Sequence, residues 1–251
     1  MSSKTDDIVE SIRTAILSHR LLPGFELREM SLSRLYGVSR TVVRQALQRL
    51  AKDGLVQLEA GRIAAVAQPT AQEAKDVFDL RIALESHVTM TLIERGSPKD
   101  VAQLRTHLRR EKAALKAGDW ETVRRLGAEF HGLMARLAGN ALLTQALEQL
   151  QGRVALILQL YHDAYDQHAG CLQEDHERFI DLIEARDGKK ALALLRAHLG
   201  AVEDSLTMDV ADRADDLHLQ RALALPAATS REAQPEPVPA APKRRTTAKR
   251  A

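Results

Sequence analysis

Apolar residues between positions 37 and 56 recur at helical spacing, and the opposite face of the same segment is cationic. The apolar positions are Val38, Val43, Ala46, Leu47 and Leu50. The polar positions are Arg40, Thr41, Arg44, Gln45 and Gln48. Ser39 precedes them where a helix N-cap is expected, and no carboxylate follows until Asp53. A helix face with cations and forked hydrogen-bonding groups suits duplex DNA, whose base edges offer donors and acceptors.

The segments on either side predict a winged helix-turn-helix domain over residues 1–68. A first amphipathic helix is indicated by Ile8, Ile12, Ala15 and Ile16, and the Pro23-Gly24 turn closes it. Residues 31–36 predict a short second helix, and Gly37 supplies the bend into the recognition helix. LVQLE (55–59) and RIAAVA (62–67) predict two strands joined at Ala60-Gly61, with Arg62 beside the tip of this wing.

A recognition helix of this kind enters the major groove by its N-terminal turn. Arginine pairs with guanine through two hydrogen bonds, and threonine reaches a phosphate or a thymine methyl group. The pattern therefore predicts that Arg40, Thr41 and Arg44 contact DNA, with Gln45 beside them and Gly61 and Arg62 in the wing.

From residue 70 to 212 the apolar period is helical throughout, which predicts an antiparallel all-helical bundle. The expected helices span 71–95, 98–117, 119–138, 140–168, 172–186 and 188–211. Breaks are expected at residues 96–98, 118–119 and 139–140, around Gly170, and at 187–188. The fold class is therefore mainly α, and bundle cores commonly hold ligand sites.

Residues 213–251 are rich in Ala and Pro without an apolar period, which predicts a disordered tail. Its end is cationic, through Lys243, Arg244, Arg245, Lys249 and Arg250. Two interpretations stay open, a solubilising tail and a segment that attracts DNA without sequence preference.

Charge is distributed unevenly beneath the net value of +2. Residues 1–68 carry ten Lys and Arg against seven Asp and Glu, and residues 213–251 carry eight against four, which leaves the middle near −5. We therefore expect only part of the chain to meet nucleic acid. The polar start, the single Cys171 and the lack of a long apolar run indicate a cytoplasmic, nucleoid-associated protein with no membrane span.

Three histidines of the bundle each lie in an apolar stripe of a different predicted helix. They are His131 in EFHGLMARLAGN, His176 in EDHERFIDLIEARDG and His198 in ALLRAHL. A single such histidine is more often a core residue, but three on separate helices can converge on a metal ion. Asn140 is expected to cap the following helix, and Trp120 and Cys171 are expected to serve packing.

The first 68 residues resemble the DNA-binding domain of the GntR family of bacterial transcription regulators. The matching positions are Pro23-Gly24, Leu27, Glu29, the run from Gly37 to Thr41, Arg44, Ala46-Leu47, Leu50, Gly54-Leu55-Val56 and Gly61. The resemblance implies that Arg40, Thr41, Arg44 and Gly61 contact DNA. Val42 stands where many relatives carry Pro or Thr, and Gln45 replaces a common glutamate, which removes a negative charge near DNA.

Residues 70–211 resemble the FCD effector domain of the FadR subfamily, in its shorter, VanR-like form with six helices. The resemblance rests on VFDLRIALES (77–86), Phe130-His131, Gly139-Asn140, the acidic residues before His176, and His198-Leu199. It implies a dimer that binds a small carboxylate effector, with Arg81 pointing toward that effector. In the alternative, Arg81 pairs with Glu85 on the outer helix surface.

In metal-binding members of that family, three histidines and one aspartate hold a divalent cation, and the aspartate lies four residues before the first histidine. Here that position is Gly127, and Glu129 lies roughly 200° around the helix from His131, too far to replace it. Three imidazoles still suit a divalent metal, with zinc or nickel favoured, and leave coordination positions open for water or a ligand carboxylate. The alternative is a pocket without metal, whose histidines bind an acidic effector directly.

These observations predict a ligand-responsive regulator that binds double-stranded operator DNA as a homodimer, with repression relieved by ligand as the commoner outcome in the family. We expect no enzyme activity, since no second carboxylate is placed as a general base for a helical metallohydrolase. An architectural DNA-binding protein without an effector is the other alternative.

Overall fold

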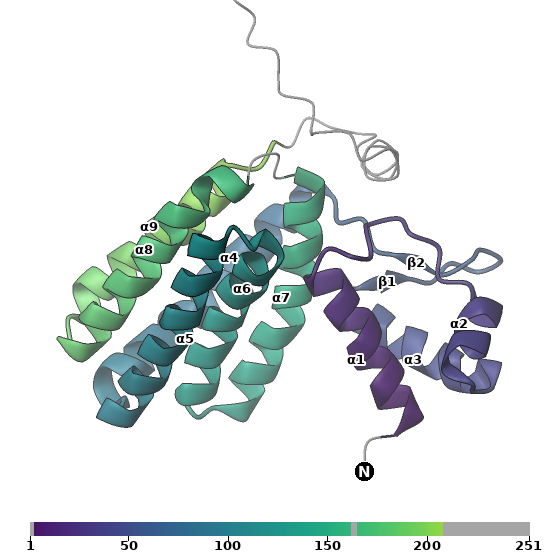
Figure 1. Ribbon diagram of the computed structural model, residues 1–251, viewed down its shortest axis with the longest axis horizontal. Helices are drawn as coiled ribbons and strands as arrows, with labels where there is room; N and C mark the ends of the chain where they lie inside the picture. Colours follow the sequence, from purple (N-terminus) through teal and green to yellow (C-terminus); the bar gives the residue numbers. More distant parts are fainter. Residues whose placement is uncertain (1–2, 162–164, 208–251) are drawn as a thin grey trace, which may run out of the picture.

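The computed structural model describes residues 3–161 and 165–207, which form a winged head beside a helical bundle (Figure 1). The head contains α1 (Lys4–Leu17), α2 (Glu29–Tyr36), α3 (Arg40–Lys52), β1 (Val56–Gln57) and β2 (Ala65–Val66). The bundle contains α4 (Ala71–Arg95), α5 (Pro98–Ala117), α6 (Trp120–Leu137), α7 (Ala141–Tyr161), α8 (Tyr165–Glu184) and α9 (Gly188–Asp204). The mainly α fold is confirmed, whereas the predicted tail lies outside the described residues. No described helix combines the length and the apolar character that crossing a bilayer requires.

The head is built around the apolar faces of α1 and α3, as their spacing predicts. Ile8, Ile12 and Ile16 of α1 pack in one core with Val43, Ala46, Leu47 and Leu50 of α3. The Ser39 hydroxyl accepts a hydrogen bond from the Val42 amide and so begins α3. Gly37 ends α2 at a φ of 63°, a left-handed conformation that glycine adopts without steric cost.

The wing is shorter than the sequence pattern predicts. LVQLE and RIAAVA contribute only two residues each to the antiparallel pair, in which Val56 lies opposite Val66 and Gln57 opposite Ala65. Beyond this pair Leu58 and Ile63 are exposed, so no burial favours extending the ladder. The other side of β2 pairs instead with the segment before α2, where the Leu27 amide donates to the Ala64 carbonyl at 2.6 Å.

The bundle helices begin and end close to their predicted positions because side-chain caps define them. Thr70 and Ser97 each form a reciprocal capping box with an acidic residue three positions later, at the starts of α4 and α5. The Asn140 side chain accepts from the Leu143 amide, which confirms its predicted role at the start of α7. Trp120 packs against the small cluster of Ala114, Val123 and Leu126, as expected.

Two predicted helix ends in the bundle are wrong. The helix expected over 140–168 ends at Tyr161, and the break expected around Gly170 falls inside α8. The Tyr161 carbonyl accepts from the Thr207 amide, which ties the end of α7 to the chain after α9. One glycine within a helix costs only about 1 kcal/mol relative to alanine, so Gly170 alone is a weak break signal. The last helix, expected to reach residue 211, ends at Asp204.

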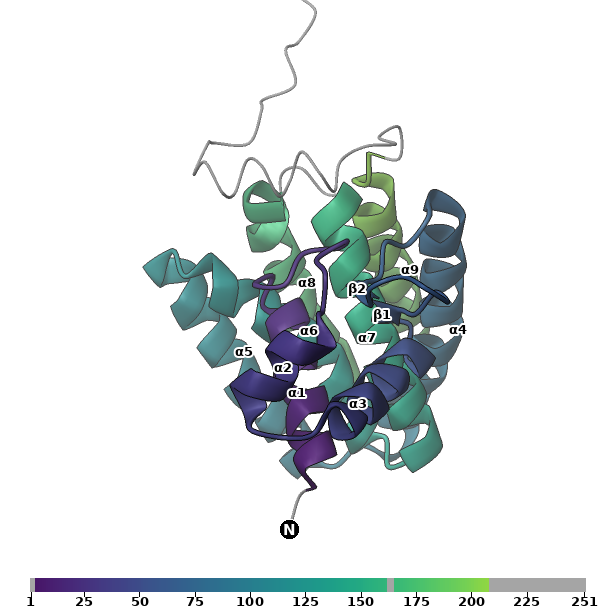
Figure 2. The ribbon, with the colours of Figure 1, turned by 90° about the vertical axis from the view of Figure 1, so that its right-hand side faces the viewer.

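Helix α7 joins the bundle to the head, with α1 beside it (Figures 1 and 2). Leu156 of α7 is buried in the core of the head, and the Gln159 amide donates to the Ile16 carbonyl at 2.9 Å. A Cβ atom added at Gly152 would lie 2.4 Å from Leu55 Cδ2, so a larger residue here would require the Leu55 side chain to shift. The same helix therefore contacts both cores.

Candidate functional site: a DNA-reading face and a histidine pocket

The residues predicted to contact DNA are all exposed on one side of the head. They are Arg40, Thr41, Arg44, Gln45, Gly61 and Arg62. Glu29 of α2 links the two arginines of α3, because its carboxylate accepts from Arg40 Nη2 at 2.9 Å and from Arg44 Nε at 2.8 Å. The arginine pair is therefore held in a fixed arrangement at the start of the recognition helix.

Glu29 stays ionised across the working pH range. The hydrogen bonds from Arg44 and then Arg40 lower the pKa of its carboxyl to about 2, against an opposing effect of burial. The sequence identifies Glu29 only as part of a family motif. Its role as the shared acceptor follows from the packing of α2 on α3, which spacing alone does not define.

A groove of about 650 Å³ runs between α2, α3 and the wing. Arg40 and Arg44 line one side of it, and Arg62 lines the wing side, paired with Glu59 at 2.7 Å. Arg28 and Arg34 add further positive charge. A concave cationic surface beside a helix N-terminal turn is the form expected for contact with a DNA backbone and one groove.

We expect Glu29→Gln to loosen sequence discrimination. The amide of glutamine keeps one uncharged acceptor oxygen in place of two anionic ones, so both arginines are held less firmly, and a charge that repels phosphate is lost. The ratio of operator affinity to random-duplex affinity should fall about tenfold, with random-duplex affinity higher than in the wild type. Fluorescence anisotropy with both duplexes measures the ratio.

Glu59→Gln is the matched control, because it removes an equal charge from the same groove and leaves Arg40 and Arg44 bound to Glu29. Equal loss of discrimination in the two variants would contradict the role of Glu29 in positioning the arginines. The lost negative charge alone would then explain the effect.

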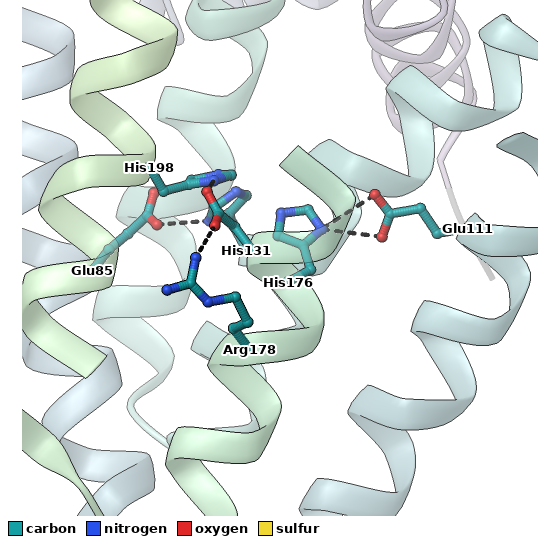
Figure 3. A network of polar contacts seen from close by, with 7 residues as sticks. Glu85, Glu111, His131, His176, Arg178 and His198 are labelled. Atoms are coloured by element: carbon teal, nitrogen blue, oxygen red, sulfur yellow. Dashed lines mark hydrogen bonds and ion pairs between the residues drawn. The ribbon is translucent and has the colours of Figure 1, made fainter. Parts of the chain in front are cut away.

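The three histidines predicted to converge do meet inside the bundle (Figure 3). His131 of α6, His176 of α8 and His198 of α9 are all buried, and one ligand atom from each lies within 4.8 Å of the others. Their ring centroids are 5.2 to 5.5 Å apart. Phe130 stacks on His176 at a centroid distance of 4.1 Å and fixes that ring.

Each of these rings turns its Nδ1 atom toward a carboxylate from a different helix. Nδ1 of His131 lies 2.7 Å from Glu85. Nδ1 of His176 lies 3.1 Å from Glu111 (Figure 3). Nδ1 of His198 lies 3.3 Å from Asp175. An ionised carboxylate only accepts, so we assign the proton of each ring to Nδ1 and a lone pair to Nε2. This carboxylate–histidine arrangement orients imidazoles that bind metal ions.

Burial keeps the imidazoles of His131 and His198 in the neutral form that a metal requires. Desolvation lowers the pKa of His131, and it lowers the pKa of His198 to about 4, in spite of the neighbouring carboxylates. Burial of Glu85 opposes its charged form, but Arg81 and His131 outweigh that effect and hold the pKa of its carboxyl far below the usual range. At neutral pH His131 and His198 are therefore neutral beside the anionic carboxylates of Glu85 and Asp175.

Arg81 lies in the interior and not on the outer surface that one interpretation of the sequence gave it. Its Nε atom donates to Glu85 at 2.8 Å, and Glu85 in turn accepts from His131, so Arg81 belongs to the histidine network. Arg81 also lines the same cavity of about 60 Å³ as the three histidines. The predicted pairing with Glu85 is thus correct, and its predicted exposure is wrong, since Arg81 is 3% exposed.

Two buried nitrogens at this cavity have no hydrogen-bond partner among the described residues. They are Nε2 of His176 and Nε2 of Gln151, a residue of α7. Buried polar atoms are nearly always paired, so this ring acceptor and this amide donor are the groups that a polar ligand of the cavity would meet. Gly127 also lines the cavity, and its missing side chain leaves space one helical turn before His131.

Sequence reasoning missed the residues that support the site. Glu111 and Asp175 belong to predicted helices, but their pairing with His176 and His198 depends on the order in which the helices pack. Leu17 and His19 line the cavity from the head, which separate treatment of the two domains could not reveal. The i to i+4 spacing of Arg81 and Glu85 was a usable signal for one pair.

Comparison with known proteins agrees with both parts of the fold. Residues 4–66 match the family of bacterial regulatory proteins called the gntR family, and residues 76–201 match the FCD domain. A Streptomyces ambofaciens protein described as an uncharacterized HTH-type transcriptional regulator in an unstable DNA locus is 30% identical over 201 residues, which cover 80% of this chain and 84% of that one. The Escherichia coli HTH-type transcriptional repressor RspR is 24% identical over 199 residues, or 79% and 87% of the two chains.

Solved structures show the same fold. A transcriptional regulator of the GntR type from Rhodococcus aligns with a TM-score of 0.72 at 24% identity, over 81% of this chain and 97% of that one. Escherichia coli McbR/YncC aligns with a TM-score of 0.69 at 21% identity, over 88% and 100%. The chain belongs to the GntR family of transcription regulators, with a winged helix-turn-helix head and an FCD domain, and it is not an enzyme.

Proposed function

We propose that this regulator represses transcription from a palindromic operator, and that its bundle senses a small carboxylate together with a divalent cation. The observation that carries the proposal is the cavity with three converging imidazoles, each oriented through Nδ1 by a carboxylate. Such an arrangement is costly to bury unless a ligand uses it.

His131, His176 and His198 would hold the cation through their Nε2 atoms, with zinc or nickel favoured over harder ions because all three donors are imidazoles. A bound cation would supply positive charge and coordination positions for an effector carboxylate. The unpaired Nε2 of His176 supports this assignment. The neutral state of His131 and His198 supports it as well.

The effector would meet two protein donors in the same cavity. Arg81 lines it with a guanidinium group, which suits a carboxylate, and Gln151 offers an unpaired amide donor. The cavity volume of about 60 Å³ is several times the roughly 10–15 Å³ of such space that one water needs, so the cavity admits a small occupant. A short carboxylate bound to the cation fits this space.

A homodimer follows from what one head can read. A single recognition helix contacts only a few base pairs, and helix-turn-helix proteins gain specificity by placing two heads on half-sites one helical turn apart. Arg40, Thr41, Arg44 and Gln45 would read bases and phosphates of each half-site, with Gly61 and Arg62 at the backbone. Sedimentation of the full chain with and without operator tests the dimer.

The ligand proposal is tested by calorimetry on chelator-stripped full-length protein. Zinc and nickel should each bind at one site per chain, and the loaded protein should then bind at least one of acetate, lactate, succinate and citrate. Binding of neither metal would contradict the cation site. Binding of a carboxylate without metal would favour the alternative in which the histidines bind the effector directly.

We expect Gly127→Asp to tighten cation binding by about tenfold or more. The new carboxylate would lie one turn before His131 at the cavity wall and add an anionic ligand, which favours hard ions such as Mn²⁺. Titration with zinc and with Mn²⁺ measures the gain. Gly127→Asn is the control of equal size without the charge, and an aspartate variant no tighter than the asparagine variant would refute the expectation.

A further inference from the structure

The effector cavity is not made by the bundle alone. Leu17 and His19, at the end of α1 in the DNA-binding head, line the same cavity as Arg81 and the three histidines. The head is held there by Gln159 of α7, whose amide donates to the Ile16 carbonyl at 2.9 Å. One wall of the pocket therefore belongs to the domain that reads DNA.

His19 adopts a backbone conformation that normally selects glycine. Its φ is 56°, in the left-handed region, directly after the C-cap Ser18. The Arg20 amide donates to the Ala15 carbonyl at 2.8 Å and the His19 amide to the Ile16 carbonyl at 2.9 Å. These two bonds define a Schellman motif, whose left-handed position is most often glycine. Histidine at this position is less favourable for the local backbone than glycine, so a role for this residue would lie in its side chain.

We propose that His19 is a ligand-contacting residue of the effector pocket, contributed by the head, which makes the pocket complete only while head and bundle are docked. The inference rests on the proposed ligand site and extends it. An imidazole N–H can donate to a carboxylate held near Arg81 and Gln151, and Leu17 supplies an apolar wall beside it.

This arrangement gives the effector a direct means of acting on DNA binding. A ligand that contacts the head and the bundle together binds the docked placement better than any other placement of the head. By linkage, operator DNA that prefers another head placement must weaken ligand binding by the same factor by which the ligand weakens DNA binding. No separate relay between the pocket and the recognition helix is then required.

His19→Gly separates a binding role from a structural one. Glycine relieves the left-handed backbone, which offsets the loss of the contacts that the His19 side chain makes, so the variant should melt near the wild-type temperature. Loss of the His19 side chain removes part of the pocket wall. A chelator should therefore remove zinc from the loaded full chain about ten times faster. The same loss should also weaken binding of the tightest of acetate, lactate, succinate and citrate to the zinc-loaded chain by about tenfold, while the affinity for zinc itself changes little. Leu17→Ala should raise the zinc release rate in the same direction.

The outcomes separate this inference from the proposed function. A wild-type chain that binds neither zinc nor nickel overturns the cation site on which both depend. A wild-type chain that binds zinc, with a His19→Gly variant that releases zinc and binds the carboxylates as the wild type does, overturns the role of His19 and leaves the bundle site standing. A His19→Gly variant that melts several degrees lower shows that the imidazole serves stability and also overturns the inference.

Discussion

Arg40→Ala is expected to weaken operator binding by about 1–3 kcal/mol, roughly 5- to 150-fold, and to relax the base preference at one position of each half-site. Arg40 is exposed at the first position of α3, where the recognition helix meets base edges, and Glu29 fixes its guanidinium beside that of Arg44. Loss of a two-pronged contact with guanine accounts for the magnitude. Anisotropy titrations with operator duplexes carrying each base at the affected position measure both effects.

Two further variants show whether the loss is one of recognition or of charge. Arg40→Lys keeps the positive charge but loses the guanidinium group that makes two parallel hydrogen bonds. It should therefore retain random-duplex affinity and still lose discrimination between operator and random duplex. Arg49→Ala removes a second exposed arginine of α3, one that pairs with Asp6 and does not line the groove. It should change operator binding little. An equal effect of Arg49→Ala and Arg40→Ala would contradict the assigned face.

His176→Ala is expected to reduce cation affinity by at least about 100-fold and to remove the carboxylate response, with DNA binding by the ligand-free protein unchanged. His176 lies at the centre of the network, between Glu111, Phe130 and the two other imidazoles. Its Nε2 is one of the buried nitrogens for which the described residues provide no partner. Calorimetry with zinc and nickel, beside operator titrations, measures the two effects.

Controls distinguish this effect from a damaged core. His176→Gln keeps a donor for Glu111 and should show the same loss of cation binding with a melting temperature closer to the wild type. His107→Gln changes a buried histidine of α5 that bonds to the Leu126 carbonyl and does not belong to the triad. Unchanged cation affinity in His176→Ala, or equal loss in His107→Gln, would contradict the assignment.

The sequence predicts the elements of this fold well because their signals are local. Capping residues such as Ser39, Thr70 and Ser97 define where helices begin, and apolar periods define which faces are buried. The errors occur where long-range contacts decide. The wing stops short where Leu58 and Ile63 are exposed, and α8 continues through Gly170 because one glycine is a weak break.

The three histidines of the candidate site could be predicted from the sequence, but the carboxylates that contact them could not. His131, His176 and His198 stand out because each interrupts an apolar stripe, and they do meet in the structure. Glu85, Glu111 and Asp175 look like ordinary helix carboxylates until packing brings them to the Nδ1 atoms. His19 could not be assigned at all, since its relation to the pocket depends on how the head docks on α7.

The most direct test of the account is one titration. An operator is first selected from random duplexes by the full chain, and its affinity is then measured with zinc-loaded protein in the absence and presence of the tightest carboxylate. We predict a change in operator affinity of at least about fivefold, with random-duplex affinity unaffected. The same affinity for operator and random duplex, or no response of the operator complex to any carboxylate with or without metal, would contradict a DNA-reading head governed by a ligand-binding bundle.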